Sequence, residues 1–378
     1  LAAAIKASEI QVGHLNGRDK TPIQALKRLK TFRKQPVIKA KFGILDRVVD
    51  DLTTLGYIGE QINKKLAYLI SISRKLKRPL SGIIVSSSGA GKTGLMMAVA
   101  QLTPEEDKLL LSRLTPQALF HFPKDALVEK LIVVDERNGS SMADYSIRTM
   151  QTSNVLTIAQ PKTKDEEGGV RSIKVKSAYM ESTTSEDINA ENASRCFVMH
   201  LDESAKATGA ILEAQRRAKT RSALDSTGEL VHWHHGHQRA LKSLPVEIPY
   251  VEQLTFPQHR VSFRREQEKF LGLIEASALL HQHERDTTEG VVKASIEDYR
   301  IAHELYSAVF KEVQCEVSRK ASALLEVMSA EGVVVFTMRQ ALSLTGWPYS
   351  TTHRVIKELL QYEYLKQDGQ KKGRHAKT

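Results

Sequence analysis

The spacing of apolar residues predicts helices that alternate with strands along much of the chain. From Gly43 apolar residues recur every three or four positions, and residues 62–76 repeat this pattern, so both stretches are expected to be amphipathic helices. Continuous apolar runs then predict buried strands at Ile83–Val85, Lys108–Leu111, Leu131–Val134, Val155–Ile158, Ile173–Met180 and Phe197–His200. Strands alternating with helical patterns indicate an α/β fold whose sheet is mainly parallel.

Beyond residue 200 the strand signals become sparse. Residues Ala205–Ala218 and Gln267–Gln282 have helical spacing. The pattern of the C-terminal part predicts three helices, at Arg319–Ala330, Met338–Thr345 and Ser350–Tyr362. It also predicts a short strand at Val333–Phe336 and a basic wing at Tyr364–Lys377. This order is typical of a winged helix, a fold that places its third helix in a DNA groove or serves as a protein-contact module.

The composition is that of a soluble globular protein. Hydrophobic residues make up 41% and charged residues 26%, which excludes wholesale disorder and a collagen-like fibre. The longest apolar run, Leu95–Ala100, is too short to cross a bilayer, so no membrane partner is expected. With only two cysteines, Cys196 and Cys315, a disulfide framework and an all-cysteine zinc site are excluded, and a cytoplasmic location is expected. The chain begins at Leu1 without a secretory pattern, which suggests a piece of a longer protein.

The positive charge is concentrated near the N-terminus. The net charge is +11, from 55 Lys and Arg and 44 Asp and Glu. Residues 1–80 contain 17 basic and 6 acidic residues, which equals the whole excess. A basic block beside a neutral body suggests a polyanion partner such as nucleic acid, although a solvated helical face has the same composition.

A candidate phosphate-binding loop, Ser86–Thr93, lies between a predicted strand and a predicted helix, which is the context that a P-loop needs. Its glycines allow backbone N–H groups to point at phosphate oxygens, and the following helix adds its positive end. Lys92 is expected to reach the β- and γ-phosphates, and the Thr93 hydroxyl to bind Mg²⁺. Ser86 replaces the first glycine of the pattern, so an ordinary strand-to-helix turn is the alternative. The residues expected to hold ATP are Ser88, Gly89, Ala90, Gly91, Lys92, Thr93, Gly94, Asp135 and Thr183.

Two carboxylates, Asp135 and Glu136, end the apolar strand Leu131–Val134. We expect Asp135 to hold Mg²⁺, directly or through water, and Glu136 to polarise the water that attacks the γ-phosphate. The alternative is a buried strand that ends in an acidic turn. Together with the P-loop, the pair predicts binding and hydrolysis of ATP with Mg²⁺.

Two later positions complete the predicted site. Thr183 follows a strand-like run, where its side chain can reach the γ-phosphate or its water. Arg195 stands just before the strand Phe197–His200 and can act as an arginine finger on a neighbouring subunit's ATP. A surface salt bridge is the alternative for Arg195.

These motifs, in this order, resemble the AAA+ superfamily and, within it, the minichromosome maintenance (MCM) type of replicative helicase. Ser194–Phe197 is similar to that family's Ser-Arg-Phe finger motif, with Cys196 inserted. Arg265–Leu271 is similar to the start of its lid helix, whose opening arginine is the second sensor; Arg264 is adjacent. The resemblance implies a homohexameric ring in which Arg195 and Arg265 act on the neighbour's nucleotide.

A closer resemblance, over about residues 43–312, is to the MCM-like helicase module of bacterial mobile-element primase-helicase proteins of the zinc-finger/Toprim type. Besides the P-loop, the similar stretches are Leu55–Glu60, Ser71–Leu76, Tyr145–Met150 and Ala278–Arg285. A serine at the position of Ser86 is ordinary in this group, and a primase or polymerase is a further candidate partner. The resemblance implies four segments: a basic segment 1–42, an AAA+ core 43–203, a helical lid 204–312 and a winged helix 313–378.

Two regions are candidates for contact with DNA. Gly168-Gly169 between β-prone runs predicts a hairpin, and in the helicases that this chain resembles such a hairpin grips the DNA backbone. Strand alternation places Lys174 and Lys176 on one face of it, whereas the acidic tip Asp165–Glu167 favours a solvated hairpin without DNA. The DNA-facing candidates are Lys162, Lys164, Arg171, Lys174 and Lys176 in the hairpin and Arg354 and Lys357 in the third helix of the winged helix.

The histidine-rich segment 232–237 has only Glu229 as a nearby carboxylate and no cysteine, so a surface loop is favoured over a metal site. Taken together, the motifs predict a ring-forming, ATP-dependent helicase or translocase that acts on single-stranded or forked DNA in the replication of a mobile element. The alternatives are an ATP-switched helicase loader or DNA remodeller without processive unwinding, and a DNA-binding scaffold with a vestigial site.

Overall fold

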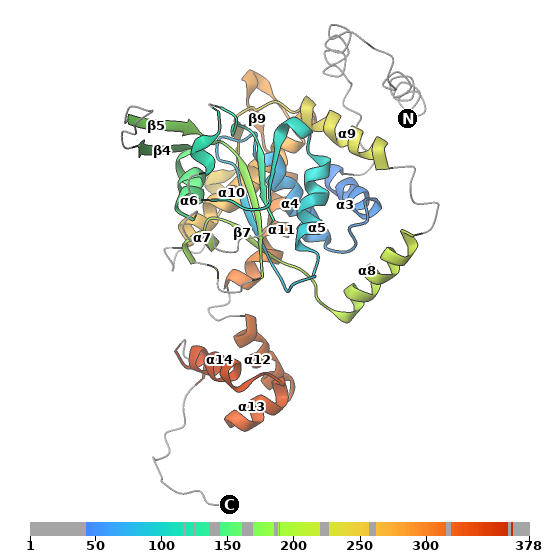
Figure 1. The fold of residues 1–378 in the computed structure, drawn as a ribbon, viewed down its shortest axis with the longest axis vertical. Helices are drawn as coiled ribbons and strands as arrows, with labels where there is room; N and C mark the ends of the chain where they lie inside the picture. The colour runs from blue at the N-terminus through green and yellow to red at the C-terminus, as the bar shows by residue number, and fades with distance from the viewer. Residues whose placement is uncertain are drawn as a thin grey trace, which may run out of the picture. The chain divides into compact units, whose positions relative to one another are not determined.

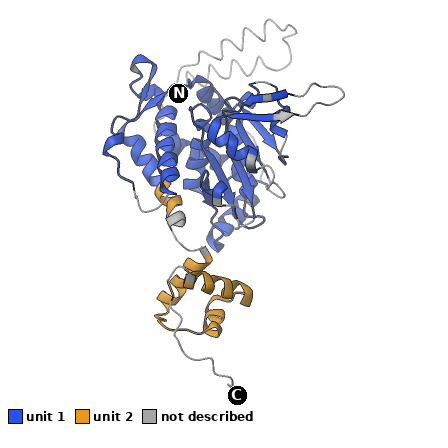
Figure 2. Ribbon diagram, turned by 90° about the vertical axis from the view of Figure 1, so that its left-hand side faces the viewer, with its two compact units in different colours: residues 1–305 blue, residues 306–378 orange. Residues whose placement is uncertain are grey.

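The computed structural model describes residues 43–115, 118–123, 125–135, 144–160, 169–184, 188, 190–219, 227–256, 262–314, 319–361 and 364–365. It divides into two compact units, residues 1–305 and 306–378 (Figure 2). The predicted basic segment 1–42 and nearly all of the predicted wing lie outside the described residues. The finer division into core, lid and winged helix stays a prediction.

A five-stranded parallel sheet forms the centre of the first unit (Figure 1). Its strands are β1 (Ser81–Val85), β2 (Lys108–Leu111), β3 (Leu131–Val134), β6 (Ala178–Thr183) and β7 (Phe197–His200), in the order β2-β3-β6-β1-β7. All four neighbouring pairs run parallel, so every strand ends at the same edge of the sheet. The predicted α/β fold with a mainly parallel sheet is confirmed.

Helices cover one face of this sheet. α4 (Gln61–Ser73) and α5 (Lys92–Leu102) pack on it, and α3 (Ile44–Thr54) and α10 (Phe263–Leu280) pack in turn on α4. The approach of α4 is close: a Cβ added to Gly82 of β1 would lie 2.9 Å from Cδ1 of Ile70. A side chain at position 82 would therefore require the side chains of Ile70 and Met199 to move.

The other face carries a β-hairpin and the short helix α6 (Asp144–Ser153). Ile132, Val134 and Tyr179 of the sheet share a buried core with Leu156 and Ile173 of the hairpin. The hairpin consists of β4 (Val155–Gln160) and β5 (Gly169–Lys174), paired antiparallel from Val155↔Lys174 to Gln160↔Gly169. Its tip, residues 161–168, lies outside the described residues. The predicted hairpin is confirmed for its two strands.

The predicted single strand Ile173–Met180 is wrong, because this run contributes to two different sheets. β5 ends at Lys174 and β6 begins at Ala178. Between them the Val175 N–H donates to the Asn154 carbonyl at 2.8 Å, and the Ala178 N–H donates to the Lys130 carbonyl at 2.9 Å. The chain thus passes from the hairpin to the central sheet without a glycine or proline to mark the change.

The rest of the first unit is mainly helical. After β7 come α8 (Ala205–Arg217), α9 (Thr227–Ala240), α10 and α11 (Ile296–Gln314), with a short parallel pair of β8 (Val246–Glu247) and β9 (Val292–Lys293). The boundary between the two units falls within α11. Within the described ranges, no helix is both long and apolar enough to cross a bilayer.

The loop expected for the histidine-rich segment is wrong, since all of it belongs to α9. His234 is fully buried, with Nδ1 3.1 Å from the Tyr68 hydroxyl and Nε2 2.8 Å from Oδ2 of Asp51. Desolvation by burial lowers the pKa of His234, despite the opposing effect of Asp51. His234 therefore joins α9 to α3 and α4. In the part of the chain that the structure describes, no three His, Cys, Asp or Glu side chains are grouped for a metal ion.

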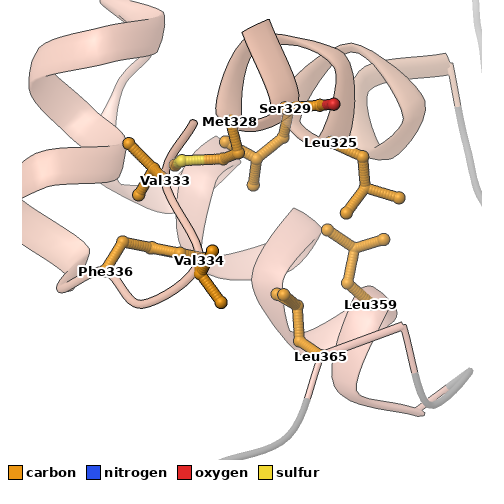
Figure 3. Close-up of a pocket in the computed structure, with 9 residues that line it drawn as sticks. Leu325, Met328, Ser329, Val333, Val334, Phe336, Leu359 and Leu365 are labelled. Carbon is orange, nitrogen blue, oxygen red and sulfur yellow. The ribbon is translucent and has the colours of Figure 1, made fainter. Parts of the chain in front are cut away.

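Besides the end of α11, the described residues of the second unit form the helices α12 (Arg319–Ala330), α13 (Met338–Thr345) and α14 (Tyr349–Gln361), as the sequence predicts to within one residue. A capping box between Thr337 and Gln340 starts α13, and Gly346, in the left-handed region, ends it. The predicted strand Val333–Phe336 is wrong: the segment forms no strand, and Val334 is 91% exposed. It borders an apolar pocket of about 180 Å³ between α12 and the end of α14 (Figure 3).

Candidate nucleotide-binding site

The loop between β1 and α5 has the geometry of a phosphate cradle. Gly89 and Gly91 have φ of +83° and +99°, a left-handed backbone conformation that residues other than glycine rarely adopt. Gly91 is also the N-cap of α5, so the N–H groups of the first turn, which have no partner within the helix, point toward the loop. Ser88, Gly89 and Gly91 are exposed, as a loop that receives a ligand must be. The predicted residues 88–94 therefore lie where a P-loop requires them.

Lys92, in the first turn of α5, lies largely inside this loop. Its side chain is buried, and Nζ donates to the carbonyls of Ser86 at 2.8 Å and Ser87 at 2.6 Å. Lysine has three donors on a flexible stem, so the same ammonium can turn toward a phosphate oxygen. The loop carbonyls thus hold Lys92 beside the position that a nucleotide phosphate would take.

Thr93 and Asp135 form the candidate Mg²⁺ site. The Thr93 hydroxyl donates to Oδ1 of Asp135 at 2.5 Å, although 42 positions separate the two residues. Asp135 directly follows β3, and its backbone is fixed by a bond from its N–H to the Leu111 carbonyl at 3.0 Å and by one from the Ser182 hydroxyl to its own carbonyl. A hydroxyl and a carboxylate oxygen fit Mg²⁺, which usually takes one or two protein ligands and fills its other positions with phosphate and water.

The order of the strands brings Thr183 into the same site. β6 lies between β1 and β3, so its end lies between the P-loop and Asp135. The Thr183 carbonyl accepts from the Ser86 N–H at 3.4 Å, and the side chain is buried. Lys92, Thr93, Asp135 and Thr183 therefore gather at one edge of the sheet. Glu136, the predicted catalytic base, lies outside the described residues.

Arg195 lies at the opposite edge of the sheet. It precedes β7, which runs parallel to β1 with Gly82↔Phe197 and Val85↔His200, so Arg195 is level with the start of β1 and the P-loop with its end. Arg265 of α10 joins it by donating from Nη1 to the Ser194 hydroxyl at 2.6 Å. The structure thus places Arg265, rather than Arg264, beside the predicted finger, and neither Arg195 nor Arg265 lies at its own P-loop.

A carboxylate shared by two arginines organises this second cluster. Glu191 pairs with Arg195 at 3.1 Å through Oε1 and with Arg148 of α6 at 3.3 Å through Oε2. Desolvation by burial, together with the positive charge of Arg265, lowers the pKa of the Arg195 guanidinium. The buried Nε of Arg195 has no hydrogen-bond partner among the described residues. The cluster is therefore a concentration of positive charge suited to an anion.

Two residues that line the P-loop were not predicted from the sequence. The ring of Tyr57 packs on the first turn of α5, where a Cβ added to Gly94 would lie 3.3 Å from its Cε2. Burial raises the pKa of Tyr57, so the ring stays neutral and presents an apolar face. The carboxylate of Glu203 accepts hydrogen bonds at the entrance of the loop. Neither residue belongs to the P-loop pattern itself, and only the fold brings them to it.

The DNA-facing candidates are distributed over both units. Arg354 and Lys357 lie on the exposed side of α14. Lys174 ends β5, but Lys176 lies beyond the strand and pairs with Glu129 at 2.7 Å, so the predicted alternation of the two within one strand is wrong. Lys162, Lys164 and the side chain of Arg171 lie outside the described parts. Their contacts with DNA stay predictions.

Comparison with known families agrees with this site. A family model described as the MTBMA_p00010 P-loop domain matches residues 40–232, just over half of the chain. The chain belongs to this family. The matched region contains the complete central sheet, the P-loop and Asp135. No curated protein matches the chain. Membership of a P-loop family indicates nucleotide binding, typically with Mg²⁺, and nucleotide hydrolysis.

Proposed function

We propose that this P-loop domain is the motor of a ring-forming, ATP-dependent DNA helicase or translocase. The observation that carries the proposal is the separation of Arg195 from the P-loop of its own chain. β7 and β1 run parallel, and Arg195 precedes β7 whereas the P-loop follows β1. An arginine finger at this position can act only on the nucleotide of a second copy, so a complete site requires an oligomer.

The surroundings of Arg195 support this interpretation. Its side chain is 18% exposed, its Nε lacks a partner within the described ranges, and Arg265 stands beside it. The salt bridge between Arg195 and Glu191 does not require Arg265 beside it. A phosphate of the nucleotide bound to a neighbouring subunit, in contrast, offers acceptors for the guanidinium groups of both Arg195 and Arg265. Together with the resemblance to MCM-type helicases, this favours a homohexameric ring.

In this mechanism the side chains at the P-loop edge act on the chain's own nucleotide. Lys92 would exchange the carbonyls of Ser86 and Ser87 for phosphate oxygens, and Thr93 and Asp135 would hold the metal ion. Mg²⁺-ATP supplies the phosphoanhydride bond whose hydrolysis drives movement. Thr183 orients the attacking water from the end of β6, and Glu136 takes its proton.

Contact with DNA is assigned to the hairpin β4–β5 and to the exposed cations of α14. The hairpin packs on the central sheet through Leu156 and Ile173 but forms a separate two-stranded sheet, and Val170 near its tip is 74% exposed, so this end can contact a ligand without opening the central sheet. Arg354 and Lys357 provide phosphate contacts of the kind that winged helices make. The resemblance to primase-helicase proteins points to replication of a mobile element and to a primase or polymerase as partner.

Strand displacement on forked DNA tests the proposal. The protein is incubated with a forked duplex, Mg²⁺ and ATP, and release of the labelled strand is measured; Lys92→Ala is the matched control without nucleotide binding. We expect ATP-dependent release by the wild-type protein and none by the control. DNA-stimulated ATP hydrolysis without release would replace the helicase by a loader or remodeller, and absence of hydrolysis would refute the motor.

A further inference from the structure

The P-loop is hydrogen-bonded at its entrance to a carboxylate that lies far from it in the sequence. Glu203 lies between β7 and α8, 116 positions after Ser87. Its Oε1 accepts from the Ser87 N–H at 2.8 Å and from the Ser86 hydroxyl, and its Oε2 accepts from the Ser87 hydroxyl. Both oxygens of one carboxylate thus accept hydrogen bonds from two consecutive loop residues. These bonds are charge-assisted, because the acceptor is a carboxylate.

This contact gives Ser86 a structural role. Ser86 stands where the P-loop pattern has its first glycine. Glycine at that position would lack the hydroxyl that donates a hydrogen bond to Glu203. Lys92 binds the carbonyls of Ser86 and Ser87, while Glu203 binds the hydroxyls of both residues and the N–H of Ser87. When Lys92 turns toward a phosphate, the bonds to Glu203 remain, together with the bond from the Ser86 N–H to the Thr183 carbonyl.

We propose that Glu203 is a positioning residue for the nucleotide: it fixes Ser86 and Ser87 so that the loop keeps its shape when Lys92 leaves their carbonyls for a phosphate. The inference rests on the proposed ATP site and adds a residue to it that the P-loop pattern does not contain. Glu203 also connects the loop to the next helix, because Ser204, the following residue, is the N-cap of α8.

The sign of the effect separates positioning from simple electrostatics. A carboxylate near a phosphate site repels the ligand, so its neutralisation alone would strengthen ATP binding. Loss of a positioning contact would instead weaken ATP binding, because the loop must then be ordered at the expense of binding energy. Glu203→Gln preserves the shape of the side chain, removes the charge and leaves one oxygen in place of two.

The test compares four proteins with the wild type: Glu203→Gln, Ser87→Ala, the double variant, and Glu213→Gln as the control. Glu213 is an exposed carboxylate on α8 that pairs with Arg217 and not with the loop serines, and Glu213→Gln makes the same change in net charge. ATP affinity is measured with a fluorescent ATP analogue, and KM and kcat for ATP are measured with DNA present.

We expect Glu203→Gln and Ser87→Ala each to weaken ATP affinity and raise KM about tenfold, with kcat within about twofold of the wild type, since a lost charge-assisted hydrogen bond has about this effect. The loss of ATP affinity in the double variant should be smaller than the sum of the two single losses, because both substitutions act on the contact between the Glu203 carboxylate and the Ser87 hydroxyl. Glu213→Gln should behave as the wild type. Unchanged or tighter binding by Glu203→Gln, or additive losses, would overturn the inference. If the wild-type protein bound no ATP, the proposed function would fail first.

Discussion

Replacement of Arg195 by alanine should abolish ATP turnover without abolishing ATP binding. Arg195 lies at the start of β7, and the P-loop at the end of β1 in the same sheet. The four residues of β7 at about 3.3 Å each separate the two by about 13 Å. The guanidinium therefore does not touch the nucleotide bound by its own chain, and Arg195→Ala leaves that binding site intact.

The size of the loss in rate distinguishes the possible roles of Arg195. At about 13 Å and an effective dielectric constant of about 20, two unit charges interact by about 1.3 kcal/mol, so long-range action within one chain changes the rate at most about tenfold. The partly exposed i,i+4 pair with Glu191 contributes about 1 kcal/mol or less to stability. A finger supplied to a neighbouring subunit accounts for about 10³–10⁵ in rate.

The assay is steady-state ATP hydrolysis with saturating single-stranded DNA, beside a direct measurement of ATP affinity. Glu191→Gln is the matched control, because it breaks the same ion pair but keeps the arginine. We expect a loss of at least about 10³-fold for Arg195→Ala and near-normal turnover for Glu191→Gln. A loss below about tenfold, or equal losses in the two variants, would refute the finger.

Three further predictions concern the site and the core. Glu136→Gln should keep ATP affinity but abolish turnover in a single-turnover assay, and wild-type turnover would remove Glu136 from the site. Thr93→Val should raise the Mg²⁺ concentration needed for half-maximal hydrolysis, since one ligand is lost; an unchanged Mg²⁺ titration would contradict the assignment. Asp298 is fully buried: burial opposes its ionisation, but hydrogen bonds from Arg285 and the Ser295 backbone outweigh this and lower its pKa. Its stabilisation is therefore present above pH 3.8, the ordinary value, and lost as the pH falls further. Asp298→Asn should cost about 3 kcal/mol in urea unfolding at neutral pH, and a loss below about 0.5 kcal/mol, the range of ordinary surface substitutions, would contradict this.

The inner strands of the central sheet, β1, β3 and β6, could be predicted because they are buried on both faces. Leu131–Val134 and Phe197–His200 were predicted with the residues that the structure shows, and Leu131–Val134 is an apolar run bounded by the polar residues Lys130 and Asp135, which marks such a strand. α9 was missed, because four histidines and a tryptophan hide the helical period. Val333–Phe336 has the composition of a strand but no strand partner among the described residues. Pairing depends on the rest of the chain and not on propensity alone.

The P-loop edge of the site could also be predicted, since its residues occur in short consecutive motifs. Their convergence follows from parallel strands that end at one edge. Glu203 could not be predicted, because nothing in the local sequence distinguishes this carboxylate from its neighbour Asp202. Its position depends on β7 lying next to β1, which is a property of the strand order. The same strand order places Arg195 at the opposite edge.

The most direct test of a nucleotide site shared between subunits is to mix two inactive variants. Lys92→Ala lacks the phosphate-binding lysine and Arg195→Ala lacks the finger, so neither forms a complete site alone. In a mixed ring, some interfaces join an intact Lys92 to an intact Arg195 of the adjacent subunit. ATP hydrolysis, measured across mixing ratios with single-stranded DNA present, should therefore rise to a maximum at an intermediate ratio. Activity that stays flat at every ratio would contradict the shared site.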